Sequence, residues 1–237
     1  VSPNWGYHTN SATAFLMTMF DVRLGLWTPN PRHSPLAGQK LGVKPDTPPK
    51  PASPIFAPAR LTSELLGSVN DTSRYVYLTD GGHFDNMGLY ELVRRRCYKI
   101  VICDAEEDGD YSYEGIGDAI RKCRIDFGAE IELDLSPTRP NAKSGLSTAH
   151  IIRGTIRYPE TPSDQKGSVW YIKASLTGKL PAAGEEESAE LPDAPGDLQN
   201  YKLRHPHFPH DSTADQWFNE SQFESYRRLG QSIVDGL

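Results

Sequence analysis

The sequence predicts an α/β fold built around a mostly parallel β-sheet, and three observations lead to that prediction. Strand-like and helix-like patterns alternate from Tyr75 to Leu135, and the connections between them are short. The run from Tyr98 to Asp104 is almost uninterrupted in apolar residues, which is typical of a strand buried on both faces. The segment from Glu114 to Gly128 repeats apolar residues at helical spacing and stops at a glycine, as a helix between two parallel strands does.

The N-terminal part of the chain shows weaker patterns. Ser11 is a suitable cap for a helix over residues 12–20, whose large apolar side chains share one face. Residues 38–60 contain too many prolines for a helix or a central strand, so they predict a long surface insertion. A short helix is expected over residues 61–66.

The central region predicts the sheet itself. The expected strands cover residues 75–80, 98–104 and 129–135, and the expected helices between them cover residues 88–96 and 114–128. Two further strand-like runs, residues 149–158 and 168–176, flank a polar turn and predict an antiparallel hairpin at the sheet edge. This order of elements predicts a parallel, helix-flanked sheet with an added hairpin.

The C-terminal region predicts a loop and then a helical tail. Residues 180–197 are acidic and rich in small residues, which is typical of a poorly ordered loop. Residues 211–237 read as helical, with capping-box-like starts at Ser212 and at Asn219. The expected packing face of this tail consists of Phe223, Tyr226, Leu229 and Ile233.

Composition excludes several classes of protein. A net charge of -6 gives no basic surface for nucleic acid, so no nucleic-acid partner is expected. No apolar stretch approaches the roughly 18–20 residues that span a bilayer. The opening residues do not resemble a signal peptide, and without an initiator methionine they read as the middle of a longer polypeptide. A cytoplasmic location, or a peripheral one at a membrane, is therefore expected.

The three cysteines, Cys97, Cys103 and Cys123, lack the spacing of a metal site. Each lies in or beside an apolar element, which favours buried free thiols in a reducing compartment, with a nucleophilic cysteine as the alternative. No cofactor and no metal ion are expected.

Asp80 is the residue whose position points most directly to chemistry. It ends the strand predicted over residues 75–80 and is followed by Gly81 and Gly82. Ligands of open α/β sheets bind at the carboxyl ends of the strands, and glycines there can take positive φ and approach a substrate closely. The alternative from the bare pattern is a helix-capping aspartate whose glycines serve only the turn.

The surrounding sequence resembles a known family. The stretch "LTDGGHFDNMGLYELVRRRC" resembles the aspartate-bearing segment of patatin-like phospholipases, and the resemblance continues through "IVICDAEEDGDYSYEGIGDAIRKCRIDFGAEIELD". The opening "VSPNWGYH" and the tail "FPHDSTADQWFNESQFESYRRLG" are also similar to this family, the tail to a subgroup of large bacterial and fungal members. The resemblance implies a three-layer α/β/α sandwich, of which residues 1–237 would be the C-terminal part of the catalytic domain.

The resemblance also implies an activity. Patatin-like enzymes hydrolyse phospholipids or other lipid esters with a serine–aspartate dyad, so Asp80 would be the base and Gly81 and Gly82 would shape its turn. The family's G-x-S-x-G serine has no counterpart here, because residues 145–149 ("GLSTA") end in alanine and lie in a polar loop. The implied partner is the N-terminal half of the same catalytic domain, and a membrane anchor elsewhere in the parent protein stays open. A non-catalytic patatin-like module for lipid binding or assembly is the alternative.

Two residues near Asp80 complete the predicted site. His83 is expected to line the pocket or cap a helix rather than to join a triad, since patatin-like sites do not use histidine. Asn86 either fixes the turn through its amide or serves simple turn chemistry.

Three other patterns are read as structural. Residues 104–115 imitate a calcium-binding loop but carry Gly115 where a bidentate glutamate is needed, so they predict an acidic loop between strand and helix. Arg94, Arg95 and Arg96 predict the solvated last turn of a helix, with a lipid headgroup contact as the alternative. The histidines 205, 207 and 210 are expected to be loop residues without metal-ligand spacing.

Overall fold

The computed structural model describes residues 25–33, 70–162, 165–178, 193–212 and 217–236, and in addition the isolated residues 12, 16, 60, 62, 63, 66, 68 and 215. These residues belong to two compact units, Val1–Asn86 and Met87–Leu237, and each unit is described by itself. The predicted helix over residues 12–20 and the proline-rich segment 38–60 lie almost entirely outside the described residues, and residues 62, 63 and 66 are the described part of the predicted helix over residues 61–66.

In the first unit, strand β1 (Leu26–Pro29) pairs antiparallel with strand β2 (Tyr75–Leu78). The rings of Trp27 and Tyr77 lie opposite each other with centroids 5.5 Å apart. A short 3-10 helix, η2 (Pro31–His33), follows β1, and another, η3 (Gly81–His83), follows β2. The prediction of a strand over residues 75–80 is therefore right in position and wrong in partner, because β2 does not join the parallel sheet.

The second unit contains a four-stranded sheet with the order β3-β6-β5-β4. Strand β3 (Lys99–Asp104) runs parallel to β6 (Gly167–Lys173), whereas β5 (Ile151–Arg157) is antiparallel both to β6 and to β4 (Glu130–Glu132). The α/β class is confirmed, but the sheet is mixed rather than mostly parallel.

The predicted hairpin forms but occupies the centre of this sheet instead of its edge. Strands β5 and β6 lie between β3 and β4, which consequently run in the same direction at opposite edges. Gly167 permits this insertion, because a Cβ there would lie 2.6 Å from the Tyr98 carbonyl oxygen. The pairing of β6 with β3 therefore needs a residue without a side chain at the point where β6 begins.

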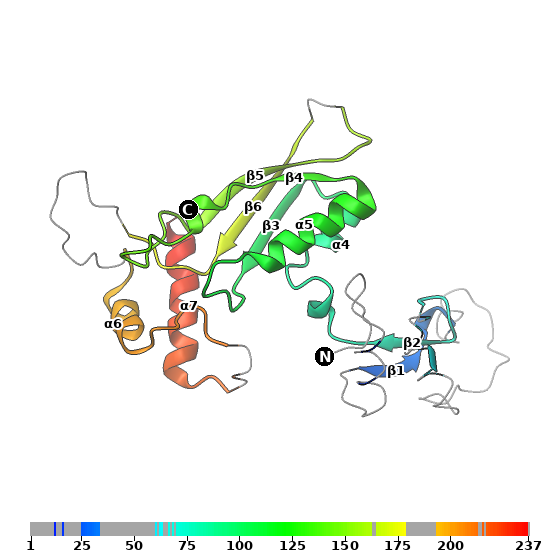
Figure 1. Cartoon of the computed structure of the whole chain (residues 1–237), viewed down its shortest axis with the longest axis horizontal. Helices are drawn as coiled ribbons and strands as arrows, with labels where there is room; N and C mark the ends of the chain where they lie inside the picture. Colours follow the sequence, from blue (N-terminus) through cyan, green and yellow to red (C-terminus); the bar gives the residue numbers. More distant parts are fainter. Residues whose placement is uncertain are drawn as a thin grey trace, which may run out of the picture. The chain divides into compact units, whose positions relative to one another are not determined.

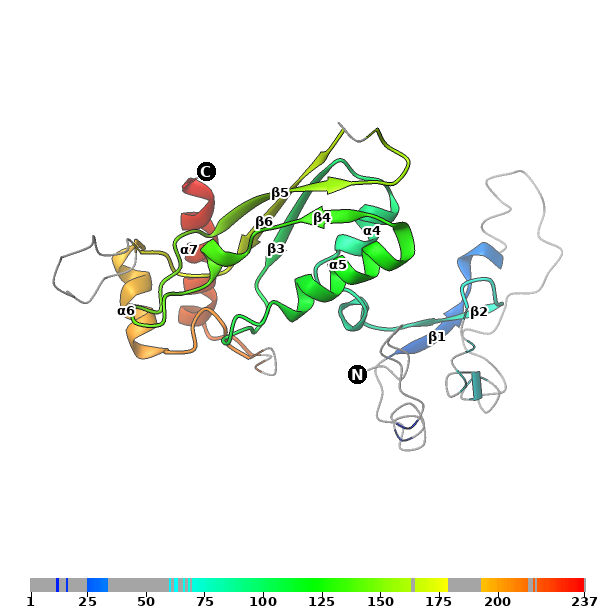
Figure 2. The same cartoon turned by 45° about the horizontal axis from the view of Figure 1, so that its top comes forward.

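Helices α4 (Leu89–Arg94) and α5 (Glu114–Phe127) cover one face of the sheet (Figures 1 and 2). Helix α5 ends as the sequence predicts, because Gly128 takes a φ of 60° and its N–H bonds the Arg124 carbonyl. The core between these helices and the sheet consists of Leu89, Val93, Ile100, Ile102, Ile116, Ala119, Cys123, Ala129, Ile131, Ile152, Ile156, Tyr158, Val169 and Tyr171, with Tyr111 and Tyr113 at its end.

Strand β3 alternates between exposed and buried residues, so the prediction that it is buried on both faces is wrong. Ile100 and Ile102 face the helices, whereas Val101 is 58% exposed and Cys103 is also exposed. The physical reason is that, among the described residues, α4 and α5 pack on one side of this edge strand. Cys103 consequently does not fit the expectation of three buried thiols.

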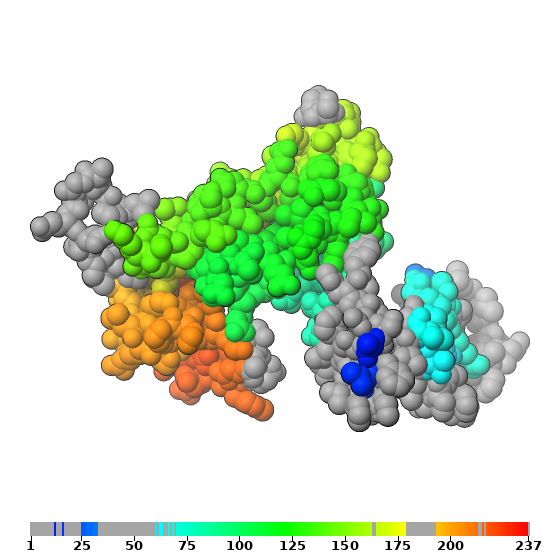
Figure 3. All heavy atoms as spheres, in the orientation of Figure 1, coloured from blue at the N-terminus to red at the C-terminus, as the bar shows by residue number. Residues whose placement is uncertain are grey.

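A second core cluster lies beyond the carboxyl end of β6, where α6 (Gly196–Arg204) and α7 (Glu220–Asp235) pack (Figures 1 and 3). It consists of Leu146, Leu176, Leu198, Tyr201, Phe208, Leu229 and Ile233. Helix α6 was not anticipated: its first residues fall in the segment 180–197 predicted as a loop, and the rest of it had no predicted structure.

Helix α7 begins at the second of the two predicted starts. The Asn219 side chain accepts a hydrogen bond from the Gln222 N–H at 2.9 Å, whereas residues 215 and 217–219 are not helical. Leu229 and Ile233 are buried as predicted, but Phe223 is 63% exposed. Tyr226 is partly buried against the second core cluster, and Gln222 and Ser225 are buried as well, so the packed face keeps three of the four predicted residues and widens at its start. In the part of the chain that the structure describes, no helix is long and apolar enough to cross a membrane.

Candidate functional sites

Asp80 lies two residues after the last residue of β2 and caps the short helix η3. Its Oδ1 accepts a hydrogen bond from the Gly82 N–H at 2.9 Å, and its side chain is 62% exposed. The Gly81 carbonyl closes the turn by accepting from the N–H groups of Phe84 and Asp85, both at 3.0 Å. The capping role that the bare pattern allowed is thus present, and it occupies Oδ1 of the carboxylate.

The two glycines differ in what they do for this turn. Neither takes a positive φ, contrary to expectation. A Cβ on Gly82 would lie 2.8 Å from Asn86 Oδ1 and 3.2 Å from Asp80 Oδ1, whereas a Cβ on Gly81 would meet open space. The Asn86 side chain thus lies against the turn, and a side chain at residue 82 would have to displace its amide.

His83 directs its ring nitrogen Nδ1 toward the turn. Its Nδ1 lies 3.3 Å from the Asp80 carbonyl oxygen and 3.9 Å from the carboxylate Oδ2. The second distance is beyond a hydrogen bond, so this is not the geometry of a catalytic triad.

The second unit contains a buried ionic cluster that sequence reasoning missed. Asp104 ends β3 and Lys173 ends β6, and the parallel register places them side by side. Lys173 Nζ donates to Asp104 Oδ2 at 3.0 Å and to Asp108 Oδ2 at 3.2 Å, and the Tyr171 hydroxyl donates to Asp104. Lys173 and Asp104 are 0% and 3% exposed. The alternation of the strand could have indicated this burial, because Lys173 shares the face of β6 that carries the buried residues Val169 and Tyr171.

The loop between β3 and α5, whose sequence imitates a calcium site, is organised around this lysine. Burial by itself raises the pKa of Asp108, but hydrogen bonds from Ser112 and Tyr113 and the charge of Lys173 outweigh it, so the pKa is lowered. Tyr111 and Tyr113 take left-handed φ angles of 51° and 56°. Among the described residues, no group of three or more His, Cys, Asp or Glu is arranged to hold a metal ion.

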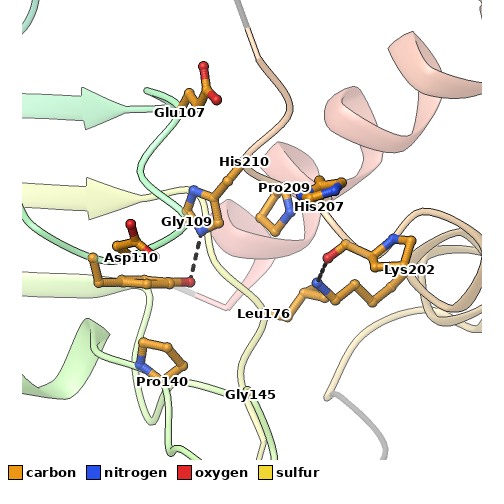
Figure 4. A pocket seen from close by; sticks show the side chains of 12 residues that line it. Glu107, Gly109, Asp110, Pro140, Gly145, Leu176, Lys202, His207, Pro209 and His210 are labelled. Carbon is orange, nitrogen blue, oxygen red and sulfur yellow. Dashed lines mark hydrogen bonds between the residues drawn. The ribbon is translucent and has the colours of Figure 1, made fainter.

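A pocket of about 420 Å³ lies next to this loop (Figure 4). The Tyr111 hydroxyl lies 2.9 Å from His210 Nε2 in its wall. Burial raises the pKa of Tyr111 to about 12, and burial together with the Lys173 charge lowers the pKa of His210. Lys202 Nζ donates to the carbonyls of Pro206 and Phe208, both at 2.7 Å, and burial lowers its pKa. His210 is thus half-buried in the wall of this pocket. The sequence predicted a loop residue there but not its burial.

The serine of the "GLSTA" stretch and the three consecutive arginines make structural contacts within the protein. Ser147 of the "GLSTA" stretch is buried and donates to the Thr138 carbonyl at 2.6 Å, so it is no exposed nucleophile. Arg94 and Arg95 pair with Glu91 at 2.6 and 2.7 Å on the helix surface and lower the pKa of Glu91 to about 2. Arg96 follows the helix and lies over the Tyr158 ring at 5.2 Å.

Comparison of the chain with family models, with curated proteins and with solved structures finds no match in any of the three.

Proposed function

We propose that this chain carries the general base of a serine-dependent lipid acyl hydrolase of the patatin-like type, acting on a phospholipid or another lipid ester. The observation that supports the proposal best is the geometry of Asp80. Its carboxylate lies two residues after the last residue of β2, accepts a hydrogen bond from the Gly82 N–H through Oδ1, and belongs to a side chain that is 62% exposed. A carboxylate held in this way keeps one oxygen free to accept a proton.

The proposed chemistry needs a serine from the N-terminal half of the same catalytic domain, on a G-x-S-x-G turn. Asp80 Oδ2 would take the proton of the serine hydroxyl while the serine oxygen attacks the ester carbonyl. The proton would then pass to the leaving alcohol, and Asp80 would deprotonate the water that releases the acyl group. Because Asp80 is exposed here, the segment that brings the serine would also shield it and raise its basicity.

The finer fold belongs to the same proposal. Helices α4 and α5 would form one layer of a three-layer α/β/α sandwich in the complete catalytic domain. No cofactor takes part in the chemistry, and the enzyme would act in the cytoplasm or at a membrane surface, where lipid esters lie. A membrane anchor in the parent protein would be compatible with either position.

The first test uses the 237-residue chain alone. It is expected not to hydrolyse p-nitrophenyl acyl esters and not to be labelled by a serine-directed fluorophosphonate, because it contains no G-x-S-x-G serine. Turnover that disappears on labelling of this chain would show that the nucleophile lies within it and that the assignment is wrong.

The second test uses the longer polypeptide that includes the serine. Asp80→Asn keeps the hydrogen bond to Gly82 but removes the proton acceptor, so kcat on micellar phospholipid should fall by about 10²–10⁴-fold with little change in KM. Asp71→Asn, an exposed aspartate of the same unit, is the matched control, and His83→Ala should cost far less than Asp80→Asn. If Asp80→Asn kept nearly the unsubstituted kcat while His83→Ala were inactive, the Ser–Asp dyad would be wrong and the base would be a histidine. A parent protein without any such serine would favour the non-catalytic lipid-binding module.

A further inference from the structure

The pocket of Figure 4 is built where α/β proteins place their ligands. It lies at the carboxyl ends of the parallel pair β3 and β6, and its wall comes from segments far apart in the chain. Its volume of about 420 Å³ is in the range of small-molecule sites. Part of the wall is rigid and apolar, from Pro140, Leu176, Pro206 and Pro209. A ligand here would be oriented by the few polar groups that reach in.

One side of the pocket is positive. Lys202 reaches into it from α6, and Figure 4 shows its amine directed toward the pocket interior. An ammonium has three donors, and two of those of Lys202 hold the Pro206 and Phe208 carbonyls, so the lysine is fixed in place with a donor remaining. Tyr111 also lines the pocket, and its hydroxyl lies 2.9 Å from His210 Nε2.

The other side is negative. Glu107 and Asp110 of the loop between β3 and α5 line the rim, are both exposed, and lie apart from Lys202 in Figure 4. The buried Lys173 nearby adds no net positive charge, because it is paired with two carboxylates, those of Asp104 and Asp108. A simple anion would be repelled by the two rim carboxylates, and a simple cation would be repelled by Lys202. The division of charge favours a ligand that carries both signs.

We propose that this pocket binds a small zwitterion in which a phosphate group stands next to an ammonium group, of the phosphocholine and phosphoethanolamine class. Lys202 holds the phosphate, and Glu107 and Asp110 face the ammonium. The proposal concerns binding in the second unit and does not depend on Asp80 or on hydrolysis. The group can arrive as a free metabolite or as the headgroup of a lipid.

The test is a titration of the 237-residue chain with phosphocholine, followed by calorimetry and by amide NMR signals of Gly109 and Gly145. Inorganic phosphate and choline serve as the two half-ligands. Phosphocholine should bind one to one and more tightly than either half. The double variant Glu107→Gln/Asp110→Asn should lower the affinity for phosphocholine by about 5–10-fold, where a tenfold loss corresponds to about 1.4 kcal/mol of binding free energy. Its affinity for inorganic phosphate should not fall. Asp235→Asn, outside the pocket, is the matched control.

Lys202→Met should abolish the binding of both phosphocholine and phosphate, and Lys202→Arg should restore most of it. Lys202 also holds the 206–208 turn, so a loss in Lys202→Met alone could reflect folding; the rim variants, which change only exposed side chains, decide the question. The proposal would be overturned if phosphocholine binding to the unsubstituted 237-residue chain did not saturate. It would also be overturned if the Glu107→Gln/Asp110→Asn variant bound phosphocholine with unchanged affinity.

Vesicles of phosphatidylcholine distinguish the two sources of the ligand. Vesicle binding that the rim variant loses assigns a lipid headgroup, whereas free phosphocholine binding without vesicle binding assigns a soluble zwitterion. Neither result depends on ester hydrolysis, so failure of the hydrolase proposal and failure of this one are separate outcomes.

Discussion

Asp80 and Asp104 look alike in the sequence and have opposite surroundings in the structure. Each comes at the end of an apolar run in the sequence, but Asp104 is the last residue of β3 whereas Asp80 lies two residues after β2. Asp80 has an exposed carboxylate that caps a 3-10 turn, whereas Asp104 is buried and bonds Lys173 and Tyr171. The difference arises from the neighbouring strand: β6 brings a lysine alongside Asp104, whereas Asp80 lies beyond the last paired residue of β2. Only the first of these aspartates is therefore available as a base.

The buried cluster predicts a large effect of a single substitution. Lys173→Met preserves the volume of the stem but leaves Asp104 and Asp108 without their cation, so the free energy of unfolding should fall by about 3–5 kcal/mol. Urea denaturation followed by circular dichroism measures this. Lys99→Met, at the exposed start of β3, is the control and should change little.

A double variant separates the ion pair from simple packing. Adding Asp104→Asn to Lys173→Met should cost much less than the sum of the single changes, because the second substitution removes the charge that the first leaves unpaired. Additive losses would mean that the contribution of Lys173 comes from its stem and not from its charge.

At the scale of elements, β3 shows how strand pattern and burial can disagree. Its sequence is apolar at nearly every position, yet its two faces have different environments. Residues of one parity pack on α4 and α5, and residues of the other parity face outward. An apolar run therefore predicts where a strand lies but does not by itself say how many layers cover it.

Two adjacent residues of β3 test this asymmetry. Ile102 is 1% exposed and Val101 is 58% exposed. Ile102→Ala should lower the free energy of unfolding by about 2–5 kcal/mol because it leaves a cavity. Val101→Ala should stay within about 0.5 kcal/mol, as expected for an exposed position. Equal losses at the two positions in urea denaturation would indicate that the outward face is covered in solution.

At the scale of the whole molecule, the packed core is concentrated in one unit. Among the described residues, every buried hydrophobic side chain except that of Tyr75 lies in Met87–Leu237. Both core clusters lie there as well, one between the sheet and α4 and α5, the other around α6 and α7. This unit has the interior that a domain needs to fold by itself.

The fragment of residues 87–237 is therefore expected to unfold cooperatively, with a urea midpoint close to that of the main transition of the full chain. Its amide NMR spectrum should overlay that part of the full chain's spectrum. A fragment without a cooperative transition would show that Val1–Asn86 contributes to the stability of the second unit, and the division into two units would not hold in folding.

The sequence by itself determined the features that depend on neighbours along the chain. It predicted the α/β class, the approximate positions of the strands, the end of α5 at Gly128 and the cap of α7 at Asn219, because helix ends and strand runs are set by local backbone chemistry. Only the tertiary structure decided which strands pair, and with them the placement of the hairpin in the centre of the sheet. It also brought together Lys173 and Asp104, 69 residues apart, and His210 and Tyr111, 99 residues apart. Such contacts form only when loop closure is offset by burial over the whole unit, so no local pattern in the sequence records them.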